Sequence, residues 1–245
     1  MDYERNEDTL RKDANLEGAP IFRPKYHCSV CCNPVDKSFA GPNATCYSCG
    51  QKPEFLDGIS HVEAGAIYYP KGDWGELNGT VIQELIKFSR EIWDAKDLEH
   101  TDKMVEILAL TFQKYPDFKS FDKLMIPPSS SSGPNHMIPK AERISDRFDI
   151  PFYNSIEEIE STGEMKNKSS ASARMSSAED NYRCNIDVNN ERILILDDMV
   201  TSGSTATGIA TALHDKGAAE VGVASITRTV DAWALKNRDL VREKR

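Results

Sequence analysis

The sequence of 245 residues lacks any long apolar run. No stretch approaches the roughly 18 consecutive apolar residues that a membrane-spanning helix needs, so we expect no membrane insertion. Segment 1–16 is rich in charged residues, unlike the apolar core of a signal peptide, and we expect a cytoplasmic location. An excess of positive charge is also lacking, because the formal net charge is −9. This charge argues against broad attraction to nucleic acid and leaves open a local basic patch.

Cysteines are few, and most of them are ordered in a pattern. Two Cys-x-x-Cys pairs frame a short interval with little hydrophobic material, and their members are Cys28, Cys31, Cys46 and Cys49. Four thiolates at this spacing predict a closed, structural Zn²⁺ site in a zinc ribbon at 26–55. A module this short can bury only a small hydrophobic core. The bound metal would therefore hold it together.

Two alternatives accompany the ribbon. Disulfides would also use paired cysteines, but a cytosolic chain disfavours them. Cys32 competes with Cys31 as a zinc ligand, and the two-residue spacing favours Cys31. Ribbons often dock onto a neighbouring domain or a protein partner, and the sequence does not identify which.

The most informative segment is 193–205. Four branched apolar residues at 193–196 predict a central strand covered on both faces, as in a parallel sheet. Asp197 and Asp198 follow, at the carboxyl end of the predicted strand, where open α/β sheets bind ligands. Small residues come next, before a predicted helix whose free N–H groups and positive dipole end suit a phosphate. The residues of this loop are Thr201, Ser202, Gly203, Ser204 and Thr205.

Strands and helices alternate along the rest of the chain, which predicts an α/β domain. Strands are expected at 59–69, 121–126, 149–153 and 221–227, and helices at 81–93, 104–112 and 140–148. Lys140 and Arg143 lie where a side chain can reach an anion near the start of the last helix, although such charges more often face solvent. We expect a flexible extension at 1–25 and a helical tail at 231–245.

The segment 193–205 resembles the phosphoribosyl diphosphate (PRPP) motif of type I phosphoribosyltransferases: four apolar residues, two acids, a short bridge and a Thr/Ser-Gly-x-Thr loop. With the four-cysteine ribbon, Leu85-Ile86-Lys87-Phe88 and Ile226-Thr227-Arg228-Thr229, the chain is similar to ComF-like proteins over roughly residues 26 to 230. The resemblance implies a type I phosphoribosyltransferase fold at 56–230, with a parallel sheet flanked by helices and a mobile hood, after the ribbon.

The resemblance also implies roles for individual residues. Asp197 and Asp198 would contact the ribose hydroxyls, directly or through Mg²⁺, and the loop 201–205 would receive the 5-phosphate. The two carboxylates would also stabilise the positive charge that develops on the ribose when pyrophosphate departs, so they are the predicted catalytic residues.

Two further segments take their roles from the same resemblance. The Ser-rich segment 161–181 occupies the place of the hood. A pyrophosphate loop is expected after the strand at 121–126, although its composition also suits a flexible linker, and its residues are Ser129, Ser130, Ser131, Ser132 and Gly133.

Two functions are compatible with these motifs. The first is a transferase of the glycosyltransferase class that moves phosphoribosyl from PRPP to an unknown nitrogen acceptor. The second is a non-catalytic accessory protein that responds to PRPP or a nucleotide, or acts in DNA uptake, with the ribbon contacting a partner. ComF-like chains commonly carry basic residues in the loop where this chain has Ser129 to Ser132, which favours the second function. The intact motif favours the first.

Overall fold

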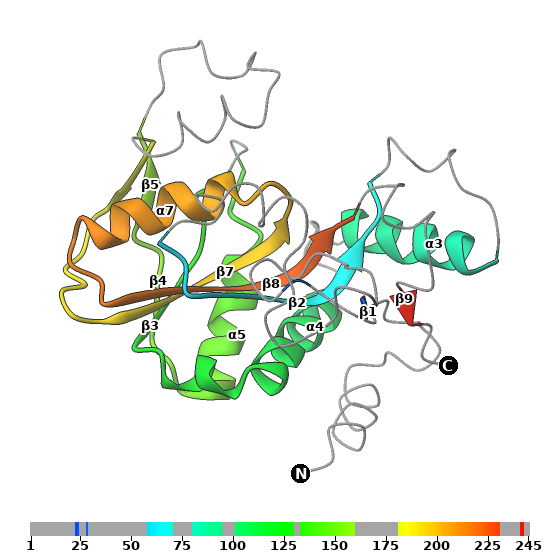
Figure 1. The fold of residues 1–245 in the computed structure, drawn as a ribbon, viewed down its shortest axis with the longest axis horizontal. Helices are drawn as coiled ribbons and strands as arrows, with labels where there is room; N and C mark the ends of the chain where they lie inside the picture. The colour runs from blue at the N-terminus through cyan, green and yellow to red at the C-terminus, as the bar shows by residue number, and fades with distance from the viewer. Residues whose placement is uncertain are drawn as a thin grey trace.

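A five-stranded parallel sheet forms the centre of the protein (Figure 1). The computed structural model describes residues 23–24, 28, 58–70, 80–94, 101–129, 133–159, 181–230 and 241–242. In sheet order, the strands are β2 (His61–Tyr68), β8 (Glu220–Thr229), β7 (Arg192–Val200), β3 (Lys123–Met125) and β4 (Phe152–Tyr153). The α/β class and the parallel sheet expected from the sequence are therefore confirmed.

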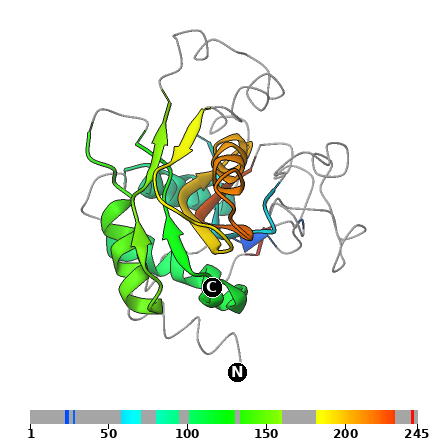
Figure 2. The same cartoon turned by 90° about the vertical axis from the view of Figure 1, so that its left-hand side faces the viewer.

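Helices cover both faces of the sheet (Figures 1 and 2). One face carries α4 (Thr101–Lys114) and α5 (Ile138–Phe148), and the other carries α7 (Ser204–His214). Helix α3 (Thr80–Asp94) contacts β2, and the short 3₁₀ helix η4 (Pro116–Ser120) leads from α4 to β3. The helices predicted at 81–93, 104–112 and 140–148 are present as α3, α4 and α5, and the helix predicted after the loop 201–205 is α7; the bounds differ by a few residues from the expected ones.

The central strand β7 explains the apolar run in the sequence. Ile193 and Ile195 pack in the core beneath α7, whereas Leu194 and Leu196 pack in the core beneath α4 and α5. All four side chains are fully buried, because successive side chains of a strand point to opposite faces and both faces are covered. Each such side chain contributes roughly 1.5–3 kcal/mol through burial.

Strand β7 extends further than the sequence predicts. Its hydrogen-bonded register with β8 continues through Asp197 opposite Ser225 to Val200 opposite Arg228. The two acids therefore lie inside the last part of the strand and not beyond its end, which corrects the expected boundary. The reason is the length of β8, whose ten residues give β7 a hydrogen-bonding partner past the apolar run.

The connections that follow β3 and β7 lead to opposite sides of the sheet. The chain leaves β3 through α5 to reach β4 on one side, and it leaves β7 through α7 to reach β8 on the other side. The carboxyl ends of β3 and β7 therefore border a topological switch point. Ligands of open α/β sheets bind at such a point.

One glycine fixes the distance between β2 and α4. A Cβ atom on Gly65 would lie 2.1 Å from the carbonyl oxygen of Ile107, so only glycine allows this close approach. The helix thereby packs directly on the backbone of the edge strand.

In the described part of the chain, two small sheets lie outside the main one. Strands β5 (Ile156–Glu158) and β6 (Tyr182–Cys184) pair antiparallel and flank the segment in which the hood is predicted. Residues 160–180 lie outside the described ranges, so the hood stays a prediction. Strand β1 (Arg23–Pro24) pairs with β9 (Val241–Arg242). A helical tail is expected at 231–245, and the only part of it that the structure describes is β9, which is a strand.

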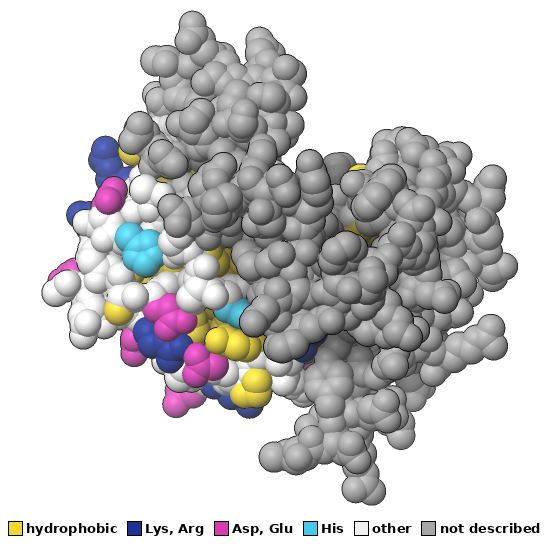
Figure 3. All heavy atoms as spheres, viewed as in Figure 1, with side chains coloured by type: hydrophobic (Ala, Val, Ile, Leu, Met, Phe, Trp, Pro, Cys, Tyr) yellow, Lys and Arg dark blue, Asp and Glu magenta, His cyan; other side chains and the backbone are white. Residues whose placement is uncertain are grey.

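The described surface carries charges of both signs. Figure 3 shows acidic and basic side chains next to one another on the described part of one face. Among the helices that the structure describes, none is both long and apolar enough to cross a membrane.

Candidate functional site

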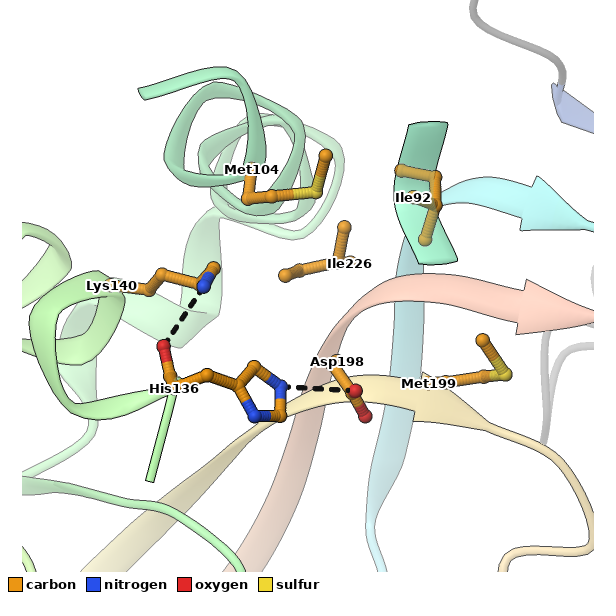
Figure 4. Close-up of a pocket in the computed structure, with 7 residues that line it drawn as sticks. All are labelled: Ile92, Met104, His136, Lys140, Asp198, Met199 and Ile226. Carbon is orange, nitrogen blue, oxygen red and sulfur yellow. Dashed lines mark hydrogen bonds and ion pairs between the residues drawn. The ribbon is translucent and has the colours of Figure 1, made fainter. Parts of the chain in front are cut away.

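Asp198 lies at the switch point and contacts a histidine that sequence reasoning did not select. Nε2 of His136, two residues before α5, lies 3.1 Å from Oδ2 of Asp198 (Figure 4). The two residues are 62 positions apart in the sequence. The fold thus brings the loop after β3 onto the acidic end of β7.

Lys140 lies in the first turn of α5, beside this pair. Its side chain is buried, and Nζ donates a hydrogen bond of 2.8 Å to the carbonyl oxygen of His136. Arg143 on the same helix is exposed and forms an ion pair with Asp102. Of the two cations considered in the sequence, Arg143 therefore faces solvent and Lys140 faces the acidic site.

Asp197 has a different environment from Asp198. Its Oδ1 accepts a hydrogen bond of 2.8 Å from the backbone N–H of Asp198. Burial raises the pKa of Asp197 well above its ordinary value, and the negative charge of Asp198 raises it further. Two carboxylates held this close repel one another when both are ionised, so the pair suits a cation or the hydroxyl groups of a ligand.

The loop after β7 has the geometry of an anion site. Gly203 caps α7 with φ of 77° and ψ of −1°, a left-handed conformation that favours glycine. The helix starts at Ser204, so the N–H groups of its first turn have no acceptor within the helix and lie at its positive end. The hydroxyl groups of Ser202 and Ser204 form a hydrogen bond, with 3.0 Å between the two Oγ atoms. The structure thus places the predicted residues 201–205 in one turn at a helix start.

Side chains of β8 hold the end of β7 in place. Oγ1 of Thr227 donates to the carbonyl oxygen of Asp198 at 3.1 Å. The buried Arg228 donates to the carbonyl oxygen of Val200 at 2.7 Å and also to that of Thr201. These bonds fix the backbone from the second acid to the start of the loop.

Tyr182 connects the loop to the β5–β6 hairpin. Its half-buried phenol forms a hydrogen bond with the hydroxyl of Thr205, and burial raises its pKa. The pKa is raised further by the carboxylates of Glu158 and Asp197. The hairpin that flanks the predicted hood is therefore hydrogen-bonded to Thr205, a residue that is predicted to bind phosphate.

The predicted pyrophosphate loop is described in part. Ser129 and Gly133 lie in described ranges, whereas Ser130, Ser131 and Ser132 lie outside them. Asn135 closes the described end, because its side chain donates to the carbonyl oxygen of Pro127 at 2.8 Å and accepts from the N–H of Met137 at 3.0 Å. Pyrophosphate binding by this loop stays a prediction.

The predicted zinc site also stays a prediction. Cys28 is described and buried, and Cys31, Cys46 and Cys49 lie outside the described residues. Within the described part of the chain, no group of three or more His, Cys, Asp or Glu side chains is placed to hold a metal ion.

A pocket opens beside Asp198 on the face of α4 and α5 (Figure 4). Its polar members are the second acid itself and the two side chains beside it, and its other members are apolar. The lining residues are Ile92, Met104, His136, Lys140, Asp198, Met199 and Ile226. The pocket therefore joins the acidic end of β7 to an apolar surface.

Sequence reasoning missed His136, Arg228 and Tyr182 as members of this site. His136 follows Gly133-Pro134-Asn135, directly before a helix, and a ring nitrogen at a predicted ligand loop was the available signal. Arg228 is a charged residue at the end of an apolar strand. For Tyr182 the sequence offered no comparable signal.

A comparison with protein-family models matches residues 138–242. The match is to a phosphoribosyl transferase domain. It includes α5, both acids, the loop 201–205 and β8, and it covers less than half of the chain. No curated protein matches the chain. The part of the chain that carries the site is thus similar to a phosphoribosyl transferase domain.

Several solved structures resemble the chain weakly. The allosteric regulatory enzyme of purine biosynthesis shares 23% identity over 43% of this chain and 22% of its own, with a TM-score of 0.32. Phosphoribosylpyrophosphate synthetase from Mycobacterium smegmatis shares 19% sequence identity over 51% of this chain and 33% of its own, with a TM-score of 0.33. Purine phosphoribosyltransferase from Pyrococcus horikoshii Ot3 shares 18% sequence identity over 58% of this chain and 92% of its own, with a TM-score of 0.33. This chain thus spans a third or less of the first two proteins.

Proposed function

We propose that the chain is a phosphoribosyltransferase that binds PRPP with a divalent cation and transfers phosphoribosyl to a nitrogen acceptor. One observation carries the proposal. The segment that matches the phosphoribosyl transferase domain places two adjacent carboxylates and a helix-start loop at the end of one central strand. A ribose phosphate needs these two kinds of contact next to each other.

The loop 201–205 would bind the 5-phosphate of PRPP. N–H groups of the first turn of α7 and the hydroxyls of Ser202, Ser204 and Thr205 are donors, and the helix dipole favours an anion there. Gly203 leaves room for close approach of the phosphate to the backbone. Arg228 keeps this loop in register with β7 through its bonds to two carbonyl oxygens.

The acidic pair would bind the ribose and support Mg²⁺. Carboxylate oxygens are ligands that Mg²⁺ prefers, and it is often bound by one or two carboxylates together with substrate phosphates. The raised pKa of Asp197 beside Asp198 fits such a site, because a cation would relieve the repulsion between the two groups. When bound, Mg²⁺ would help neutralise the pyrophosphate group.

The residues of the chain would stabilise charge during the transfer. The bond from ribose C1 to the pyrophosphate oxygen breaks, and pyrophosphate leaves with the electron pair. A bond from C1 to the acceptor nitrogen forms, and a proton carried by that nitrogen passes to water. Asp197 and Asp198 present fixed negative charge to the positive charge that develops on the ribose ring.

A second function has support from one sequence observation. Ser129 to Ser132 replace the basic residues that ComF-like chains commonly carry in this loop, which would weaken the grip on pyrophosphate. The chain would then bind PRPP or a nucleotide without turnover, as a sensor or a DNA-uptake accessory protein. The ComF-like identity, a ribbon that binds a protein partner and a cytoplasmic location belong to the same set of proposals.

Calorimetry with PRPP tests the binding site. We expect Mg²⁺-dependent binding that weakens sharply when Asp197→Asn and Asp198→Asn are combined. Asp187→Asn is the matched control, because Asp187 is exposed and precedes β7. Equal affinity in the double variant and the wild type would show that the acids are not the ribose site.

Release of pyrophosphate separates the two functions. The wild type is incubated with PRPP, Mg²⁺ and a panel of nitrogen heterocycles. Release with one acceptor supports the transferase. Tight PRPP binding without release for any acceptor would instead favour the sensor.

A further inference from the structure

Asp198 is held by two neighbours that come from different parts of the sheet. Oγ1 of Thr227 in β8 donates to the backbone carbonyl oxygen of Asp198 at 3.1 Å, and Nε2 of His136 lies 3.1 Å from Oδ2 of the carboxylate. An ionised carboxylate only accepts hydrogen bonds, so the ring nitrogen is the donor in this contact. The backbone of Asp198 is thus fixed from β8, and its side chain is fixed from the loop that follows β3.

Asp197 is held in a different way. Its Oδ1 accepts a hydrogen bond of 2.8 Å from the N–H of Asp198, within the same strand. This contact forms with the strand itself, whereas the contact of His136 with Asp198 joins residues that are 62 positions apart. The orientation of the second acid therefore depends on how the loop after β3 is placed.

Hydrogen bonds fix the backbone of His136 on both sides along the chain. Before it, the side chain of Asn135 donates to the carbonyl oxygen of Pro127 at 2.8 Å and accepts from the N–H of Met137 at 3.0 Å. After it, Nζ of the buried Lys140 donates to the carbonyl oxygen of His136 at 2.8 Å. A ring on a backbone held in this way can present its N–H to one fixed place.

The pocket beside His136 and Asp198 is too small for a ligand. Its volume is about 10 Å³, which is room for about one water molecule (Figure 4). Sites for small organic molecules commonly measure about 300–1,000 Å³. The polar groups around this pocket therefore act on one another. Such an arrangement supports the residues of a neighbouring binding site.

The contact between His136 and Asp198 is partly shielded from water. Their side chains are 27% and 22% exposed. The charge of Lys140 lies nearby, because burial lowers the pKa of Lys140 and the negative charge of Asp198 opposes this shift. A hydrogen bond to a carboxylate in such surroundings holds the carboxylate more firmly than a fully exposed ion pair would.

We propose that His136 is a positioning residue whose Nε2–H fixes the carboxylate of Asp198 in the orientation that receives PRPP and its divalent cation. The proposal rests on the proposed function and adds the residue that prepares its acidic site. Without the ring nitrogen, repulsion by Asp197 would turn the carboxylate away from this orientation. Lys140 and Asn135 hold the backbone of His136 and act one step further from the ligand.

Two variants of His136 test this role. His136→Phe keeps a flat ring and removes the donor, whereas His136→Gln keeps an amide N–H that can reach Asp198. Calorimetry measures PRPP affinity over a series of Mg²⁺ concentrations. We expect the Phe variant to bind PRPP roughly tenfold more weakly and to need more Mg²⁺, and the Gln variant to recover most of the loss. Arg143→Gln, at an exposed position of α5, is the control.

Two further measurements separate positioning from a general loss of structure. Inorganic phosphate needs only the loop 201–205, so its affinity by NMR titration should stay within about twofold of the wild type in both His136 variants. Nitrogen NMR of the imidazole rings in the ligand-free wild type identifies which nitrogen carries the hydrogen, and we expect Nε2–H for His136. If the Phe variant does not fold, His136→Ala removes the same donor without adding bulk.

Unchanged PRPP affinity and Mg²⁺ dependence in the variants that lack the donor would overturn the inference. A Gln variant no better than the Phe variant, an equal loss of phosphate affinity, or a bare Nε2 in the ligand-free protein would also overturn it. Failure of the proposed function looks different, because the wild type would then bind no PRPP, and the inference would fail together with it.

Discussion

His61 gives the folded protein a predictable dependence on pH. It begins β2, and its ring stacks on Tyr115 with centroids 3.7 Å apart and an angle of 8° between planes. Its pKa is lowered from 6.5 to about 4, first by burial and then by the charge of Lys114, and the charges of Asp117 and Glu220 oppose this shift. Glu63, which forms an ion pair with Lys114, lies 3.4 Å from the ring nitrogen. The folded protein therefore holds His61 neutral at pH values where the unfolded chain protonates it.

The sign and size of the effect follow from the two pKa values. Between pH 6.5 and about 4, the unfolded chain binds more protons than the folded chain, so the free energy of unfolding falls as pH falls. At about 1.4 kcal/mol per pH unit, the loss reaches about 3 kcal/mol by pH 4. Above pH 6.5 the contribution of His61 does not change.

His61→Phe isolates this contribution, because phenylalanine keeps a flat ring against Tyr115 and does not titrate. Urea unfolding of both proteins from about pH 7 to about pH 4 gives the difference in free energy of unfolding. Asp117, Glu220 and Asp197 also titrate in both proteins, and only the couplings of Asp117 and Glu220 to His61 differ between them. We expect the wild type to lose about 3 kcal/mol relative to the variant over this range. Parallel curves for the two proteins would refute the reasoning.

Three further changes have definite expected results. Gly203→Ala should cost about 1–2 kcal/mol, because φ there is 77°, and should weaken ribose 5-phosphate binding in calorimetry; unchanged affinity would contradict the anion site. Gly65→Ala should destabilise the fold by about 1–3 kcal/mol or more in urea unfolding, since its Cβ would lie 2.1 Å from the oxygen of Ile107; equal stability would contradict the packing of α4 on β2. Metal analysis should find about one zinc per chain, and less in Cys46→Ser; a folded, metal-free wild type would refute the ribbon.

Local sequence patterns predicted the elements of the main sheet well. The apolar run at 193–196 predicts a strand covered on both faces, and the helix at 101–114 buries Met104, Val105, Leu108 and Phe112 as its spacing predicts. The order of small residues around Gly203 predicts a helix start, and α7 begins at Ser204. These features depend on residues within a few positions of each other, where backbone periodicity and turn chemistry act directly.

Boundaries were less predictable because partners set them. Strand β7 includes Asp197 and Asp198 since β8 continues beside it, and hydrogen bonds between strands are not encoded in either strand alone. Burial of Lys140 was missed for a similar reason. A lysine in the first turn of an isolated helix would face water, and packing of α5 against the sheet and α4 turns it inward.

Local residue patterns were enough to predict an α/β chain with a strand, two acids and a helix-start loop that suit a ribose phosphate. The residues that surround the acids could be found only from the fold, because they come from distant parts of the chain. His136 and Asp198 are 62 positions apart, and Arg228 holds a loop that precedes it by more than twenty residues. Such contacts arise where strand order brings the carboxyl ends of β3, β7 and β8 together, and strand order depends on packing between distant segments.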